Sequence, residues 1–165
     1  LVTYCRGTSI GSQAASLLAK QINYDGNRSD SGEFTFKVSA MANGYGLQWG
    51  QQITAGQRTD SASTSPATGL DTLVSLAFGA QAFLHITAFT GTSVVVKIQD
   101  SADNASFADV TGLSFASASA AGAQRIASAN TATVRRYVRA ITTGTFSNAV
   151  FSVNLVKNEQ AGQVF

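Results

Sequence analysis

The stretch Val94–Val110, VVVKIQDSADNASFADV, contains an alternating strand, a polar turn and a second alternating strand. Val94, Val96 and Ile98 point to one side and the residues between them to the other, which is the two-residue period of a half-buried strand. The Asp, Ser and Asn residues at positions 100–104 favour a tight turn, because their side chains hydrogen-bond to nearby backbone. The stretch therefore predicts a β-hairpin.

The composition describes a weakly charged globular chain. The sequence has 165 residues, of which 44% are hydrophobic and 12% are charged, and its formal net charge is +2. Such a chain can fill a core, whereas its small net charge gives little attraction for a nucleic-acid backbone. Cys5 is the only cysteine, which excludes an intrachain disulfide and a cysteine-based metal site. No apolar run reaches the roughly 18 residues of a membrane span, so we expect no membrane insertion.

Further extended segments are predicted in the first part of the chain. Phe34, Phe36 and Val38 occupy alternate positions of one segment, and a second extended segment covers residues 45–54. The segment 12–21 contains good helix formers but is short. One or two turns of helix and an extended strand therefore both remain open for it.

The second part of the chain has the pattern of a β-sandwich of immunoglobulin-like or jelly-roll type. About eight short strands follow one another with turn residues between them and no helical pattern. They are expected at residues 70–78, 82–89, 94–99, 106–110, 112–118, 123–128, 134–142 and 149–157.

A polar segment separates the two parts. Residues 55–69 contain almost no large apolar side chain and hold the only proline, Pro66, which is typical of a linker. We therefore predict an all-β chain with a first domain, a linker, a sandwich domain and a tail, at residues 1–62, 63–69, 70–158 and 159–165.

No combination of residues predicts an active site, so we expect neither an enzyme nor a cofactor or metal site. His85 is the only histidine, and its neighbours on the strand could not orient it as a base. The three aspartates of positions 100–109 fit turn capping better than a calcium loop, since their spacing is not that of an EF-hand. Asp30 and Glu33 lie in a polar turn, without the apolar pocket that glycoside hydrolysis requires.

A cluster of arginines could bind a partner. Arg135, Tyr137 and Arg139 share one face of a predicted strand and could hold a carboxylate, a sugar or a phosphate. Ion pairs with surface aspartates are the alternative. Arg136 falls on the opposite, apolar face, where it would need a buried partner or a place at the sheet edge.

Two sets of segments carry a family resemblance. The first set is Gln21–Gly26, Gly32–Ala40 and Asn43–Gly56, and the second is Leu84–Ala88, Val96–Asn104, Phe107–Asp109, Ala123–Arg125 and Arg136–Ala140. The first set resembles the latter half of the tube-forming domain in major tail proteins of long-tailed bacteriophages. The second set is similar to the C-terminal β-sandwich that many of these proteins append.

The resemblance implies a structural protein of the virion. Six subunits would form a ring, the rings would stack into a tail tube that conducts DNA without sequence-specific binding, and other tail proteins would be partners. Because a complete tube domain needs more strands than residues 1–62 provide, we expect either a missing N-terminal portion or a different, smaller virion protein. The implied subunit contacts are Phe34, Phe36, Val38, Tyr45, Leu47 and Trp49, and the implied weak contacts with host glycans are Arg135, Tyr137 and Arg139.

Two other functions remain open. A carbohydrate-binding adhesive module would act as a monomer, with Trp49 and Tyr45 stacking on sugar rings. A capsid decoration protein would share the fold, bind a capsid lattice and fail to polymerise.

Overall fold

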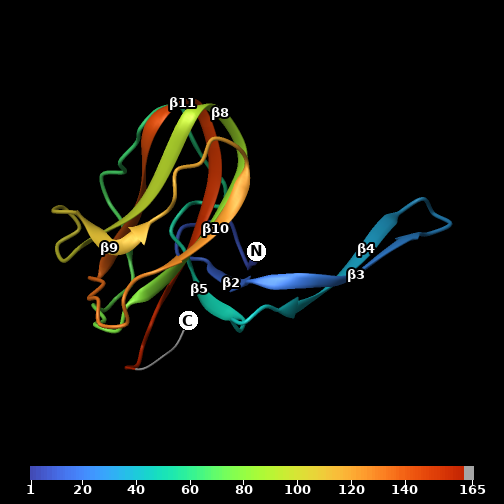
Figure 1. Cartoon of the computed structure of the whole chain (residues 1–165), viewed down its shortest axis with the longest axis horizontal. Coiled ribbons are helices and arrows are strands. Elements are labelled where there is room, and N and C mark those ends of the chain that lie inside the picture. Colours follow the sequence, from blue (N-terminus) through green and yellow to red (C-terminus); the bar gives the residue numbers. More distant parts are fainter. Residues whose placement is uncertain (162–165) are drawn as a thin grey trace.

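Two long strands form the centre of the body. β8 spans Ala80–Ser101 and β11 spans Tyr137–Lys157, and they pair antiparallel along their whole lengths. Both strands arch over at the top of the body, so that the ribbon they form folds back on itself (Figure 1). The computed structural model describes residues 1–161, with the side chains of Tyr24 and Phe36 left out of that description.

Glycines permit the bend in this ribbon. Gly91 and Gly144 have φ angles of 151° and 132°, a region that L side chains rarely adopt. A Cβ atom on Gly144 would lie only 2.3 Å from the backbone oxygen of Ser93. A register shift on either side of Phe146 accompanies the bend, as a β-bulge does.

The bend corrects the predicted strand boundaries. The segments 82–89 and 94–99 belong to the single strand β8, and 134–142 and 149–157 fall for the most part in β11. The prediction ended strands at these glycines, but the glycines bend the strands without interrupting the pairing.

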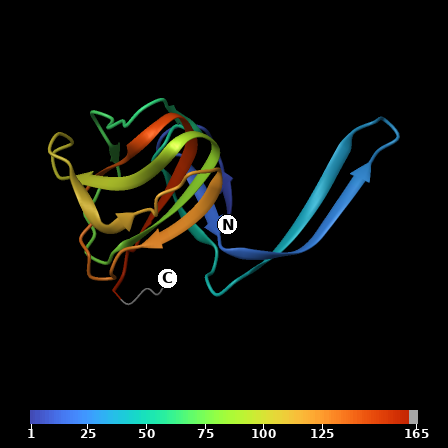
Figure 2. The same cartoon turned by 45° about the horizontal axis from the view of Figure 1, so that its top comes forward.

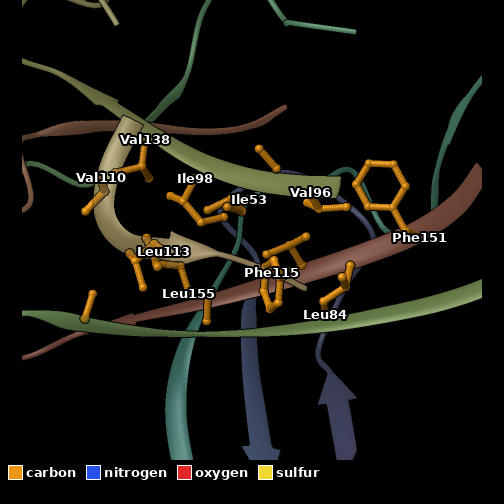
Figure 3. Packing of buried hydrophobic residues seen from close by; sticks show 14 of the residues in the cluster. Ile53, Leu84, Val96, Ile98, Val110, Leu113, Phe115, Val138, Phe151 and Leu155 are labelled. Carbon is orange, nitrogen blue, oxygen red and sulfur yellow. The ribbon is translucent and has the colours of Figure 1, made fainter. Parts of the chain in front are cut away.

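The hydrophobic core lies between the two halves of the bent ribbon (Figure 3). Leu84 and Phe151 come from one half and Val96 and Ile98 from the other, and all four are at most 1% exposed. Leu113 of β9, which spans Ala108–Ser114, packs into the same cluster. The predicted hairpin of residues 94–110 is confirmed, since β9 pairs antiparallel with β8.

Other strands line both edges of the ribbon. On the β8 side lie β9 and β10, which spans Gly122–Ala127. On the β11 side lie β5 (Gln48–Gln52), β6 (Arg58–Asp60) and β7 (Leu70–Asp71). These strands, with Thr64 between β6 and β7, pair one after another with β11 in the antiparallel direction.

The predicted linker thus lies against the sheet edge. The backbone N–H of Thr64 donates to the carbonyl of Thr142 at 3.0 Å, and the reverse bond measures 2.9 Å. Strands on both sides of the segment 63–69 belong to one nine-stranded sheet. Whether residues 1–62 and 70–158 are separate folding units stays a prediction.

The first two strands extend this sheet and curl over its outer face. β1 spans Val2–Cys5 and β2 spans Gln13–Leu17, and β2 pairs with β5. The Oγ1 atom of Thr3 lies 2.9 Å from the Nε2 atom of His85 on β8, and the Asn154 amide on β11 donates to the Ser16 hydroxyl at 2.8 Å. The segment 12–21, for which helix and strand were both open, is extended.

Three further boundaries differ from the prediction. The segment 70–78 is a strand only at Leu70–Asp71, because Leu73 has a positive φ of 70° that interrupts the pairing. The segments 106–110 and 112–118 contribute to the single strand β9. At the end of the predicted sandwich, Asn158 is fully buried and donates to the Phe78 carbonyl at 2.7 Å. Of the predicted tail 159–165, residues 162–165 lie outside the described residues.

A second, two-stranded sheet projects from the body. β3 spans Ala19–Arg28 and β4 spans Phe34–Ala42, and they pair only with each other (Figure 2). We call this hairpin, residues 19–42, the arm.

The fold class is all-β. The described residues form two antiparallel sheets, and the larger one is consistent with the predicted β-sandwich. Among residues 1–161 there is no helix with the length and hydropathy needed to cross a membrane.

Replacing a phenylalanine with alanine should change the free energy of unfolding much more in the core than in the arm. We expect Phe151→Ala to lower the free energy of unfolding by about 3–5 kcal/mol, because it leaves a cavity in the core. Phe34→Ala, at a position 60% exposed on the arm, serves as the matched control and should change it by less than about 0.5 kcal/mol. Urea unfolding of the dilute protein measures the free energy of unfolding of both variants. Equal losses of stability in the two variants would contradict the distinction between a packed core and an exposed arm.

Candidate assembly surface

The arm is a well-formed hairpin because its tip satisfies its own polar groups. Gly32 has a φ of 86°, and its N–H donates to the Ser29 carbonyl at 2.9 Å. The N–H of Ser29 donates to the Glu33 carbonyl at 2.9 Å, and the Ser29 hydroxyl lies 2.7 Å from that of Ser31. The turn at residues 29–33 therefore holds a defined shape at the far end of the arm.

On β4, one face of the arm is apolar and exposed. Along β4, Phe34, Val38 and Ala40 share a face, and Thr35 and Lys37 lie on the other. Phe34 is 60% exposed and Val38 48%. The side chain of Phe36, the third predicted contact on this strand, lies outside the described residues.

Such an arm would be stabilised by a contact with another protein. A lone two-stranded hairpin is marginally stable in water, because it cannot bury enough apolar surface to offset the lost chain entropy. Ile22 and Met41 add further exposed apolar surface near the root of the arm, at 59% and 62% exposure. Exposed apolar surface of this kind is typical of a contact with another protein.

The root of the arm is fixed to the body. The Arg125 guanidinium on β10 lies 3.9 Å from the centre of the Tyr45 ring, and its Nε donates to the Gln81 side chain at 3.2 Å. The N–H of Asn43 donates to the Leu18 carbonyl at 2.8 Å, where the arm leaves the body. Tyr45, a predicted subunit contact, therefore packs within its own chain.

Of the remaining two predicted contacts, Trp49 lies beside a groove. Leu47 and Trp49 are 53% and 52% exposed. Trp49 borders a hollow of about 410 Å³ whose walls come from β5, β11 and residues 70–76, and it also lines an adjoining hollow near residues 156–161. We call this region the Trp49 groove. Its apolar lining residues are Trp49, Ile53, Leu70, Val74, Leu76 and Leu155.

One wall of the Trp49 groove is held in a strained conformation. Leu73 is 75% exposed at a φ of 70°, which is costly for a side chain of its size. Its N–H donates to the Asp71 carboxylate at 2.8 Å, and that carboxylate accepts two hydrogen bonds from Arg136 at 2.7 and 2.6 Å. The Arg136 hydrogen bonds lower the pKa of Asp71 to about 2.

A lysine that the sequence analysis did not single out secures the same wall. The Lys157 ammonium donates to the Thr72 hydroxyl at 2.9 Å and to the Val74 carbonyl at 2.6 Å. Burial lowers the pKa of Lys157 to about 8. Its position at the end of a predicted strand carried no signal of this role.

The predicted arginine cluster is engaged within the chain. Arg135 forms an ion pair with Asp100 at 2.6 Å. Arg139 donates to the Gln99 side chain and to the Pro66 carbonyl, and its guanidinium lies 3.9 Å from the centre of the Phe107 ring. The role of Arg135, Tyr137 and Arg139 as glycan contacts stays a prediction.

Of the two surroundings expected for Arg136, the structure shows the place at the sheet edge, beside β7. Its side chain is exposed and pairs with Asp71 at 2.6 Å, because Arg136 lies just before β11 begins. At that position the alternation of the strand does not yet apply.

The polar turn after β8 is a capped loop. Asp103 accepts hydrogen bonds from the Ser101 hydroxyl and from the backbone N–H groups of Ala105 and Ser106. These bonds hold the pKa of Asp103 well below its usual range. The predicted turn capping is confirmed for this residue. In the described part of the chain, no three His, Cys, Asp or Glu residues are grouped so that they could hold a metal ion.

Neither the comparison with protein-family models nor the comparison with curated proteins gives a match for this chain. The assignment of a function therefore rests on the arm and the Trp49 groove.

The half-buried ammonium of Lys157 should make stability depend on pH. Its pKa is about 8 in the folded chain against 10.5 for an ordinary lysine, so the unfolded chain binds more protons between these values. The stability of the wild-type protein should therefore rise, relative to Lys157→Met, as the pH rises from 8 to 10.5. Urea unfolding at several pH values measures this difference, and parallel curves for the two proteins would contradict it.

Proposed function

We propose that this protein is a self-assembling structural subunit of a bacteriophage tail tube. Six copies would form each ring, and the rings would stack around a lumen that conducts DNA. The sandwich would lie on the outside of the virion. The observation that carries the proposal is the arm, which holds exposed apolar side chains away from the body (Figures 1 and 2).

The arm supports self-assembly because contact with a neighbouring copy would stabilise it. Fully burying a large apolar side chain contributes about 1.5–3 kcal/mol. Phe34 and Val38 are about half exposed, so burying the rest of both would together contribute about 1.5–3 kcal/mol. In a ring or tube every copy donates one arm and receives another, which multiplies this gain over the assembly.

The edges of the large sheet also support assembly. β1 and β10 are the end strands of the sheet path, and an edge strand presents backbone groups that another strand can pair with. The low charge of the chain agrees with broad contacts between copies, because few charges would have to lose water.

A carbohydrate-binding module is the second candidate. Trp49 is half exposed beside a hollow that also contains Arg6, Gln13 and Gln51, and aromatic rings with polar neighbours are the usual partners of sugar rings. This candidate predicts a monomer, and it assigns no role to the apolar face of the arm.

Two substitutions of equal chemistry on opposite faces of the arm test the proposal. We expect Val38→Asp to abolish rings and stacked tubes, because it places a charge on the apolar face. Thr35→Asp adds the same charge to the polar face and should leave assembly intact. Sedimentation velocity and electron microscopy at rising protein concentration measure both variants.

Assembly that is unchanged by Val38→Asp would contradict the role of the arm. A wild-type protein that stays monomeric at every concentration would contradict self-assembly itself, and the carbohydrate-binding function would then be favoured.

A further inference from the structure

We infer that the Trp49 groove of one copy receives the tip of the arm from a second copy. This inference rests on the proposed function and specifies the contact that joins neighbouring copies.

The arm cannot fill the groove of its own chain. It extends away from the body in both views, and its tip at residues 29–33 is the part farthest from the body (Figures 1 and 2). The ten residues of β3 span about 33 Å at ~3.3 Å per residue, which is long enough to reach across to another molecule. A contact between two different surfaces on identical chains is head-to-tail, so it propagates into rings or filaments.

The groove offers an apolar lining for the apolar side chain nearest the tip. Phe34 is the first residue of β4 and is 60% exposed. The hollow beside Trp49 has a volume of about 410 Å³, which is within the ~300–1,000 Å³ range of ligand pockets and so has room for an aromatic ring and its neighbours. The aliphatic side chains of Leu70, Val74 and Leu76 line it and provide contact for such a ring.

The charges of the two surfaces are complementary. Asp30 and Glu33 lie at the tip beside Phe34, and Arg6 and Lys157 lie in the wall of the groove. The remaining charges have the reverse signs, since Arg28 is next to the tip and Glu159 lines the groove. Residues 28–34 thus carry two carboxylates and one cation, and the groove carries two cations and one carboxylate, which favours their encounter.

The groove is also preorganised. The strained backbone at Leu73 donates its N–H to the Asp71 carboxylate, which Arg136 holds in place by two further hydrogen bonds. Lys157 donates to the residues on either side, Thr72 and Val74. Strain of this kind persists only where surrounding contacts impose it, and it is concentrated at functional sites. A wall fixed before binding lowers the entropy that docking would otherwise cost.

A mixing experiment tests this contact with full-length variants. Trp49 is the only tryptophan, so its fluorescence reports on the groove alone. The receiver is Phe34→Ala, which keeps the groove but has a defective arm. The donor is Trp49→Phe, which keeps the arm and has no tryptophan signal. The control donor carries both substitutions, Phe34→Ala and Trp49→Phe.

We expect the donor to shift the receiver's Trp49 emission to shorter wavelength in a saturable way, because the docked tip removes water from the ring. The control donor should give at least a tenfold weaker response. Wild-type protein should show the same blue shift on assembling, and Trp49→Glu should prevent assembly while its circular dichroism and urea unfolding stay those of a folded body.

Several results would overturn the inference while leaving the proposed function in place. The first is wild-type tubes in which Trp49 emission stays that of an exposed ring. The second is an equal shift of the receiver's emission with the donor and with the control donor. The third is a shift of Trp49 emission when a chitin hexasaccharide is added to the wild-type monomer, with assembly unaffected, which would assign the groove to a saccharide. A wild-type protein that never self-associates would instead overturn the proposed function and the inference with it.

Discussion

The antiparallel pairing of β8 with β11 is the interaction on which the rest of the body depends. It joins strands of 22 and 21 residues, and its two halves enclose the core after the ribbon bends. The bend requires Gly91 and Gly144, where a side chain would meet the backbone of the opposite strand. One long pairing thereby takes the place of several separate hairpins. The other strands of the large sheet add to an edge of this ribbon, β1 and β2 through their pairing with β5.

The same arrangement explains why the body and the arm differ. In the body, apolar residues of β8 and β11 face each other and are buried. β3 and β4 make a sheet of their own, and the apolar face of β4 is exposed. The body can therefore gain stability from its own core, while burying this face of the arm would need a contact outside the body. The proposed docking of the arm into the Trp49 groove would meet that need with a second copy.

Sequence periodicity predicted the all-β class and the hairpin of residues 94–110, because alternation and turn residues are local signals. It did not predict that β8 passes through Gly91 as one strand, since glycine is typical both of a strand end and of a bend. It placed Phe34 and Val38 on one face, yet alternation alone does not tell whether that face packs on the body or projects from it.

The groove lay further beyond the reach of sequence reasoning. Trp49 was singled out as an aromatic, but Lys157 and Leu70 are far from it in sequence and line the same hollow only because of the folded sheet. The pairing of Arg136 with Asp71 likewise depends on where β11 begins, a boundary that alternation does not define to the residue. Contacts of this kind come from tertiary structure, which local patterns do not encode.

The central claim is that the arm is ordered by a second copy, whereas the body is stable by itself. Amide hydrogen exchange followed by mass spectrometry, at a concentration below assembly and at one above it, tests this most directly. The account predicts that β8 and β11 are protected at both concentrations, and that residues 19–42 become protected only in the assembled protein. Equal protection of residues 19–42 at both concentrations, with assembly confirmed by sedimentation, would contradict it.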